Sequence, residues 1–205
     1  MAGLLITDKS NGVGKVLLNR PEAGNALTPA LLDALVALLH DFSRDPAVRS
    51  VLVTGIGKTF CAGDDREALA RDGQAAYQAA IQAFIDCQKP IVCAPRGDSF
   101  DTGLELALAS DFRIASDTAR FAATWVGAGI APPLTKSLLP AAIGTGRAAD
   151  CLLRGTIITA DEAARIGLVH QTVPDADLKT VATALAETLA AVDPKTLAAL
   201  KSLLR

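Results

Sequence analysis

The sequence predicts an α/β fold built around a parallel sheet, and three observations support this prediction. Short runs rich in β-branched and aliphatic residues, typical of buried strands, occupy positions 50–54, 90–94 and 111–115. Stretches with apolar residues at helical spacing alternate with them, at positions 28–44, 65–87 and 103–109. No linker-like composition or usable internal repeat divides the 205 residues. Strands that alternate with helices at this spacing favour parallel pairing within one domain.

The N-terminal part is expected to form a hairpin, a loop and a long helix. Residues 4–7 and 16–19 flank a turn of Gly and Asn residues, which is typical of a β-hairpin. Residues 20–26 are expected to be a loop. Thr28 and Pro29 then supply an N-cap and an N1 proline for the helix that follows.

The rest of the chain continues the alternation. The strand at 50–54 is ended by glycines, and the helix at 65–87 is expected to break or fray near Asp72 and Gly73. The helix at 103–109 is short and built from small and aliphatic residues. The remaining elements are expected to be helices near 135–143, 146–153 and 160–166, a strand at 168–171, and two helices that begin at Ala176 and Pro194.

Composition argues against several functional classes. The formal charge of −2 and the absence of Lys or Arg runs disfavour a nucleic-acid partner, but a phosphorylated small molecule remains possible. The four cysteines, Cys61, Cys87, Cys93 and Cys151, have neither CxxC spacing nor metal-ligand grouping with the histidines, so reduced buried thiols and no metal are expected.

The chain is expected to be cytoplasmic. Its N-terminus lacks a basic region and meets charge too early for a signal peptide. No stretch approaches the roughly 18 uninterrupted apolar residues of a membrane span. We therefore expect no membrane partner.

Two turns from a predicted strand into a predicted helix carry the candidate chemistry. They are Phe-Cys-Ala-Gly-Asp-Asp at 60–65 and Asp-Thr-Gly at 101–103. Backbone N–H groups at a helix N-terminus lack partners and can hold a developing negative charge. Two such turns that converge on one carbonyl oxygen would form an oxyanion hole.

Six groups of residues lie in an order and spacing typical of one family. They are 18–22 with 25–27, 51–55 with 60–63, 89–92, 104–115, 155–160 and 162–169. With these motifs over nearly its whole length, the chain resembles the crotonase superfamily, the enoyl-CoA hydratase/isomerase family. The resemblance implies a spiral of ββα units at 1–145, followed at 146–205 by C-terminal helices that are fewer than is typical. It also implies a homotrimer or hexamer, an acyl-CoA thioester as substrate, and no separate cofactor.

The resemblance also assigns roles to residues. The thioester oxygen would be bound by the backbone N–H groups of Asp64 and Thr102, and Glu105 would match the first of two catalytic glutamates. Lys58 and Arg66 are candidate phosphate partners. The positions that match the family's CoA and acyl contacts are Ala23, Ala26, Ala62, Gly63, Asp65, Arg66, Gly103 and Trp125.

Several departures from the family pattern limit the chemistry. Asp101-Thr102-Gly103 replaces a run of glycines, which brings negative charge to the expected oxyanion hole. It also places the β-branched Thr102 where the backbone is expected to be strained for such a residue. Trp125 replaces the second glutamate, and an indole cannot accept a proton from carbon or water. The resemblance to dehalogenases that this tryptophan suggests is weakened by Pro133, which stands where their nucleophilic aspartate is found. Residues 130–136, with two prolines, are expected to give a stiffer wall to the acyl pocket. The family's last helical turns are missing, so a more open pocket or greater reliance on a neighbouring subunit is expected.

Two readings of function therefore stay open. The first is an acyl-CoA enzyme in which Asp64 and Thr102 stabilise an enolate and Glu105 alone carries protons, by proton transfer, slow hydration, thioester hydrolysis or decarboxylation. The second is a degenerate member that binds acyl-CoA or a partner protein without efficient turnover. If these residues have structural roles only, Glu105 is a first-turn helix carboxylate that the helix dipole stabilises, and Trp125 fills space in the core. Asp64, Asp98 and Asp101 would then be caps or turn residues.

Overall fold

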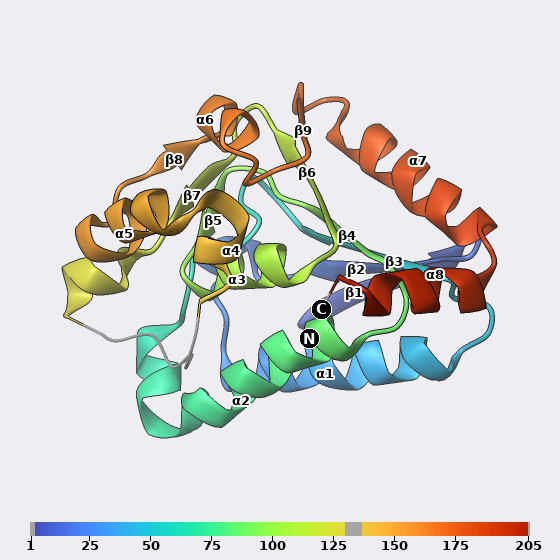
Figure 1. Cartoon of the computed structure of the whole chain (residues 1–205). Helices are drawn as coiled ribbons and strands as arrows, with labels where there is room; N and C mark the ends of the chain where they lie inside the picture. Colours follow the sequence, from blue (N-terminus) through green and yellow to red (C-terminus); the bar gives the residue numbers. More distant parts are fainter. Residues whose placement is uncertain (1–2, 130–136, 205) are drawn as a thin grey trace.

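A computed structural model describes residues 3–129 and 137–204, with the side chains of 68–73 excepted. The predicted stiff wall at 130–136 lies outside these described residues. The main sheet has six strands in the order β1-β2-β3-β4-β6-β9 (Figure 1). Its strands are β1 (Leu5–Ser10), β2 (Val13–Leu18), β3 (Ser50–Gly55), β4 (Ile91–Ala94), β6 (Phe112–Ser116) and β9 (Gln171–Val173).

The sheet is parallel except at its first pair, which is the predicted hairpin. β1 and β2 are antiparallel, whereas β2, β3, β4, β6 and β9 run parallel to one another. Asn11 and Gly12 form the turn of the hairpin with φ values of 51° and 79°. Positive φ at both central residues is the signature of the tight turn that suits twisted strands.

A second sheet of very short strands was not predicted. It has the order β5-β7-β8 and comprises β5 (Asp98–Phe100), β7 (Arg120–Ala122) and β8 (Ile158–Thr159). Strands of two or three residues contain too few positions to show a period of two, so pattern reasoning could not find them.

Eight α-helices and two 3₁₀ helices connect the strands within the described part of the chain. The helices are α1 (Pro29–Arg44), α2 (Arg66–Asp86), α3 (Thr102–Ala109), α4 (Leu139–Ile143), α5 (Thr145–Arg154), α6 (Ala160–Arg165), α7 (Leu178–Ala191), α8 (Pro194–Ser202), η1 (Pro21–Ala23) and η2 (Thr124–Ala128). Thr28 caps α1 as predicted, because its Oγ1 accepts from Leu31 N at 3.2 Å.

Two sequence predictions are wrong in detail. The backbone of α2 is continuous through residues 72 and 73, so the expected break is absent there. The strand expected at 168–171 begins only at Gln171. The N–H groups of Leu168 and Val169 both donate to Ala163 O, at 2.8 and 3.2 Å, so they close the end of α6 and cannot join the sheet.

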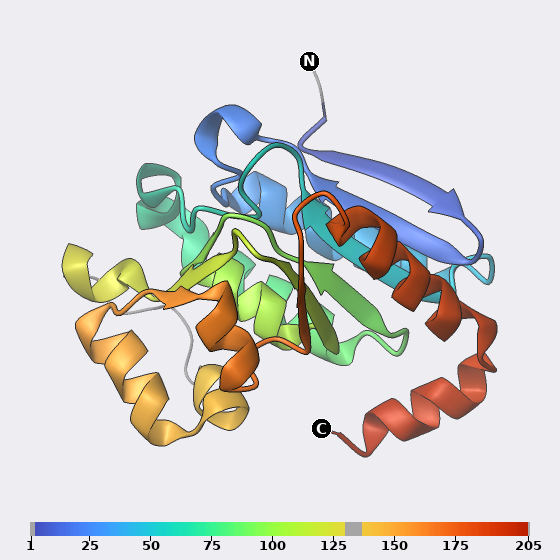
Figure 2. The same cartoon turned by 90° about the horizontal axis from the view of Figure 1, so that it is seen from above.

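Helices cover both faces of the main sheet. Along β3, Val51 and Val53 pack with α1 and α2, whereas Leu52 between them packs with α7. Successive strand residues point to opposite faces, so this alternation fixes which helices cover which face. Figure 1 shows α1 and α2 on one side of the sheet and α7 on the other. Seen from above in Figure 2, the yellow and orange helices around the second sheet lie at one end, away from the red α7 and α8.

No helix within residues 3–129 and 137–204 is both long and apolar enough to cross a membrane.

Candidate active site

The two strand-to-helix turns lie side by side. Cys61 and Ser99 form a parallel β-bridge, in which Cys61 N donates to Asp98 O at 2.9 Å and Phe100 N donates to Cys61 O at 3.0 Å. A Cβ atom on Gly63 would lie 2.9 Å from Asp101 Oδ2, and Gly63 has a φ of 106°. Glycine is therefore favoured at this close approach of the two turns.

The backbone N–H groups of Asp64 and Thr102 are both available. Leu27 N donates to Gly63 O and Asp65 N donates to Leu27 O, each at 2.9 Å, so the neighbouring bridge leaves the Asp64 N–H without a described partner. Thr102 is the first residue of α3, where an N–H has no acceptor one turn earlier in the helix. These are the two groups that the resemblance assigns to a thioester oxygen.

The backbone strain expected at Thr102 falls instead on Asp101. Asp101 has φ 52° and ψ −122°, whereas Thr102 adopts the helical conformation. A positive φ costs a residue with a side chain about 1–3 kcal/mol. The Asp101 carboxylate offsets this cost, because Oδ1 accepts from Thr124 N at 2.5 Å and Oδ2 accepts from Thr124 Oγ1 at 2.6 Å. Asp101 thereby fixes the start of η2, the helix that carries Trp125.

Trp125 holds the carboxylate of Asp64. The indole Nε1 donates to Asp64 Oδ2 at 2.9 Å, and the ring is 5% exposed. The Tyr77 and Thr102 hydroxyls lie beside the same carboxylate and interact with it, but their geometry does not reach that of a hydrogen bond. Burial raises the pKa of Asp64 above its ordinary value, which favours the neutral acid.

Glu105 is also buried and already has two hydrogen-bond donors. It is 1% exposed in the first turn of α3. Oε1 accepts from the hydroxyl of Ser137, and Oε2 accepts from Leu138 N at 3.1 Å. Burial outweighs these two bonds and raises the pKa of Glu105 above its ordinary value. A carboxyl group of this kind exchanges protons closer to neutral pH than an exposed glutamate does.

The residues expected to contact CoA gather where η1 meets the first turn. Ala62 N donates to Gly24 O at 2.8 Å, which ties the first turn to the 20–26 loop that carries Ala23 and Ala26. Arg20 links this loop to the first turn, because it donates to Ala26 O at 2.5 Å and pairs with Asp65 Oδ2 at 3.2 Å. Ala62 is exposed between these elements.

The remaining predicted residues lie around this core. Arg66 begins α2 and is near enough to Asp101 to act on its carboxylate, although burial dominates and raises the pKa of Asp101. Gly103 is buried, and a Cβ there would lie 2.7 Å from Cys61 Cβ. Asp98 is an ion-pair residue, since Arg120 binds its Oδ1 at 2.5 Å.

Sequence reasoning missed Tyr77 and Ser137. Tyr77 is the only tyrosine in the chain, 2% exposed on the inner side of α2. A lone tyrosine within an Ala-rich helix was a signal for a specific role. Ser137 Oγ also accepts from Leu139 N at 3.1 Å. A serine just before a helix was the available signal, because serine is common at helix starts. Among the residues that the structure describes, no group of three or more His, Cys, Asp or Glu side chains could hold a metal ion.

Comparisons with known proteins show the family and the fold. The model of the enoyl-CoA hydratase/isomerase family matches residues 8–205. The chain is 38% identical over 205 residues to an (E)-benzylidenesuccinyl-CoA hydratase of Thauera aromatica, covering 94% of this chain and 78% of that protein. The crystal structure of the enoyl-CoA hydratase from Bacillus anthracis has a TM-score of 0.94 and 31% identity, covering 98% of this chain and 82% of that one. The enoyl-CoA hydratase/isomerase from Pseudoalteromonas atlantica has a TM-score of 0.93 and 34% identity, with coverage of 98% and 82%.

Proposed function

Because the chain belongs to the enoyl-CoA hydratase/isomerase family, we propose that it is an acyl-CoA-processing enzyme that acts as a lyase or isomerase on a thioester. The supporting observation is the pair of available N–H groups, Asp64 N and Thr102 N, in two turns joined by a backbone bridge. In this proposal the CoA group arrives with the substrate and no separate cofactor is needed.

The first chemical step is stabilisation of negative charge on the thioester oxygen. Removal of a proton beside the thioester carbonyl, or addition to the conjugated double bond, leaves an enolate whose charge lies on that oxygen. A preorganised donor of this kind contributes about 3–4 kcal/mol to transition-state stabilisation. Asp64 N and Thr102 N supply this stabilisation through main-chain atoms, so the loss of the glycine run does not remove the donors.

Glu105 is the proposed carrier of the proton. Burial raises its pKa, which brings its change of protonation closer to neutral pH than that of an exposed glutamate. Its bonds from the Ser137 hydroxyl and Leu138 N hold the carboxyl group in one orientation. A single proton carrier supports proton transfer, hydration, thioester hydrolysis or decarboxylation, and the acyl group selects among them.

Asp64 must be neutral for the oxyanion to form at low cost. An ionised carboxylate on the residue that donates the N–H would repel the developing charge. Burial raises the pKa of Asp64, and the Trp125 indole fixes Oδ2 so that the neutral acid keeps a defined orientation. In this proposal Trp125 does not take over the chemistry of the second glutamate. It orients the carboxyl group of Asp64.

The test is turnover of crotonyl-CoA, followed by the loss of enoyl-thioester absorbance. We expect the native protein to turn over and Glu105→Gln to lose at least a hundredfold in kcat while it still binds CoA. Asp33→Asn, which removes an exposed carboxylate on α1, serves as the charge-matched control. Equal, negligible rates for native and Glu105→Gln proteins with crotonyl-CoA and longer enoyl-CoA thioesters, with CoA binding retained, would refute the hydratase assignment.

A second candidate function is favoured by the hydrogen bonds of Glu105. Both of its oxygens already accept from described groups, as expected of a carboxylate with a structural role. On this alternative the chain binds acyl-CoA, or a partner protein, without efficient turnover. Retained CoA binding with no turnover distinguishes it from the first candidate, and loss of CoA binding removes both.

We also propose a cytoplasmic homotrimer or hexamer, for which light scattering is the direct measurement.

A further inference from the structure

A cavity lies on the α7 side of the main sheet. Its volume is about 280 Å³. The ends of β2, β3 and β4 form one wall through Leu17, Thr54 and Ala94, and the first turns of α7 form the other through Leu178 and Ala182. No described residue of the candidate active site lines it. A ligand in this cavity would therefore be distinct from the substrate of the candidate active site.

The cavity lies at the carboxyl ends of three parallel strands. β2, β3 and β4 run parallel, and the lining residues Leu17, Thr54 and Ala94 lie at or next to the C-terminal end of each strand. Leu17 and Leu52 share this face of the sheet, because β2 and β3 are paired with Lys15 opposite Leu52 and Leu17 opposite Thr54.

The cavity combines an apolar floor with a positively charged rim. Leu17, Leu52, Leu178 and Ala182 supply the apolar surface. The charged lining residues are Lys15, Arg96 and Lys179, and none of the described residues that line the cavity is an Asp or Glu. Such a lining suits a ligand with an apolar body and one anionic end.

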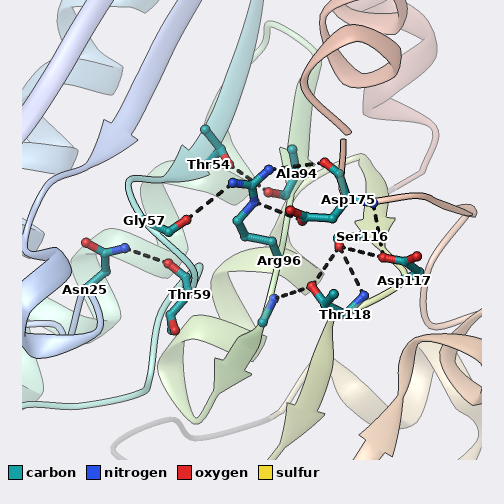
Figure 3. Close-up of polar contacts among 11 residues, drawn as sticks. Asn25, Thr54, Gly57, Thr59, Ala94, Arg96, Ser116, Asp117, Thr118 and Asp175 are labelled. Atoms are coloured by element: carbon teal, nitrogen blue, oxygen red, sulfur yellow. Dashed lines mark hydrogen bonds and ion pairs between the residues drawn. The ribbon is translucent and has the colours of Figure 1, made fainter. Parts of the chain in front are cut away.

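Arg96 is the most firmly placed of the three cations (Figure 3). It donates to Gly57 O at 3.4 Å and to Asp175 O at 3.3 Å, and its Nε lies 3.2 Å from Asp175 Oδ1. Asp175 is anchored in turn, because its N–H donates to Asp117 Oδ1 at 3.1 Å. These contacts are long and engage only part of the five N–H donors of a guanidinium, so Arg96 can bind an anion without losing its position.

The two lysines add charge that neighbouring acids balance weakly. Lys15 Nζ lies 3.4 Å from Asp8 Oδ2, and the Asp8 side chain is 58% exposed, which makes this a weak pair. Lys179 forms no ion pair with a described residue and lies at the start of α7. The partial positive charge of the helix N-terminus acts in the same direction but is a minor contribution.

We propose that this cavity binds a short aliphatic or aromatic monocarboxylate, with its apolar part against Leu52 and Ala182 and its carboxylate among Lys15, Arg96 and Lys179. The volume is at the lower end of that of small-molecule sites, which excludes a long acyl chain or a nucleotide. The inference is independent of the proposed function, because it requires neither turnover nor CoA.

Titration calorimetry on the full chain tests the proposal, with hexanoate as the probe and saturating CoA present to occupy any CoA site. Hexan-1-ol, which lacks the charge, and inorganic phosphate, which lacks the apolar body, are the matched probes. We expect hexanoate to bind at least tenfold more tightly than either. Hexanol or phosphate binding as tightly as hexanoate would refute the ligand class. Displacement of hexanoate by CoA would refute the location.

Variants then locate the site. Lys15→Gln and Lys179→Gln should each weaken hexanoate binding at least threefold, and Thr183→Leu should weaken it tenfold by filling the cavity from α7. Lys195→Gln, which removes an exposed lysine of α8 far from the lining, is the matched control and should leave the affinity unchanged. Melting temperatures within two degrees of the native protein show that each variant is folded. Lys195→Gln weakening the binding as much as Lys179→Gln would overturn the proposal.

Discussion

Replacing Asp64 by Asn separates the charge of this side chain from its backbone N–H. Asparagine keeps the N–H that is proposed to bind the thioester oxygen, and its side-chain oxygen can still accept from Trp125 Nε1, which lies 2.9 Å from Asp64 Oδ2. What it removes is the titration. Any change in pH dependence therefore reports the carboxyl charge alone.

The magnitude follows from the position of the carboxylate. An oxyanion bound at hydrogen-bond distance from Asp64 N lies about 5 Å from the carboxylate of the same residue. At an effective dielectric constant of about 20, the repulsion is about 3 kcal/mol, or roughly a hundredfold in rate. Burial raises the pKa of Asp64, so the acid is neutral below this raised pKa and repels the oxyanion only above it.

The assay is kcat/KM for crotonyl-CoA across the pH range. The rate of the native protein should rise with the ionisation of Glu105 and fall with the ionisation of Asp64, and because burial raises the pKa of both groups, both changes should lie above the ordinary range of a carboxyl group. Asp64→Asn should lose the falling limb and exceed the native rate there by up to about a hundredfold. Asp33→Asn should keep the native profile. A variant that is inactive at every pH, or one that keeps the falling limb, would refute the reasoning.

Three further predictions concern stability and the same site. Trp125→Phe should lower the free energy of unfolding by about 1–3 kcal/mol, because it leaves the buried carboxyl group of Asp64 without its indole donor. It should also move the falling limb of the pH–rate profile to higher pH. A limb that does not move would contradict the role of the indole. Asp101→Gly should unfold at nearly the native denaturant concentration, because relief of the positive φ offsets the lost bonds to η2. Asp101→Ala keeps the strain and should be less stable than Asp101→Gly by about 1 kcal/mol. Identical unfolding midpoints for the Gly and Ala variants would be evidence against strain. Lys201→Ala should lower the free energy of unfolding by about 3 kcal/mol and raise the rate of hydrogen exchange throughout α8, because Lys201 is buried and its Nζ lies 2.5 Å from the Asp111 carboxylate. Exchange in α8 that stays at the native rate would show that this ion pair does not anchor the helix.

The sequence was sufficient for the central strands β3 and β4 and for α1. β3 and β4 have continuous aliphatic runs, and α1 has both a capping residue and an apolar face, so each has a local signal strong enough to outweigh alternatives. The short strands of the second sheet have no such signal. They exist because β5 pairs with β7 over three residues, which is a property of the tertiary fold.

The candidate site was predicted in outline, but its contacts were not. The two turns could be recognised because strand-to-helix junctions are readable from the sequence. The bond between Trp125 and Asp64 joins residues 61 positions apart, and no spacing rule predicts it. The strain was assigned to Thr102, yet the backbone places it at Asp101, because α3 begins one residue earlier than its apolar pattern and takes Thr102 into the helix.

The bridge between Cys61 and Ser99 has a consequence for how such a site can diverge. It is made entirely of main-chain atoms, so the spacing of the two turns is insensitive to most substitutions in either of them. Side chains at Asp64, Asp101 and Thr102 can then vary in charge and shape without a change in that spacing. In a chain built in this way, the chemistry of the two turns can change through their side chains while the scaffold that presents the N–H groups of Asp64 and Thr102 is preserved.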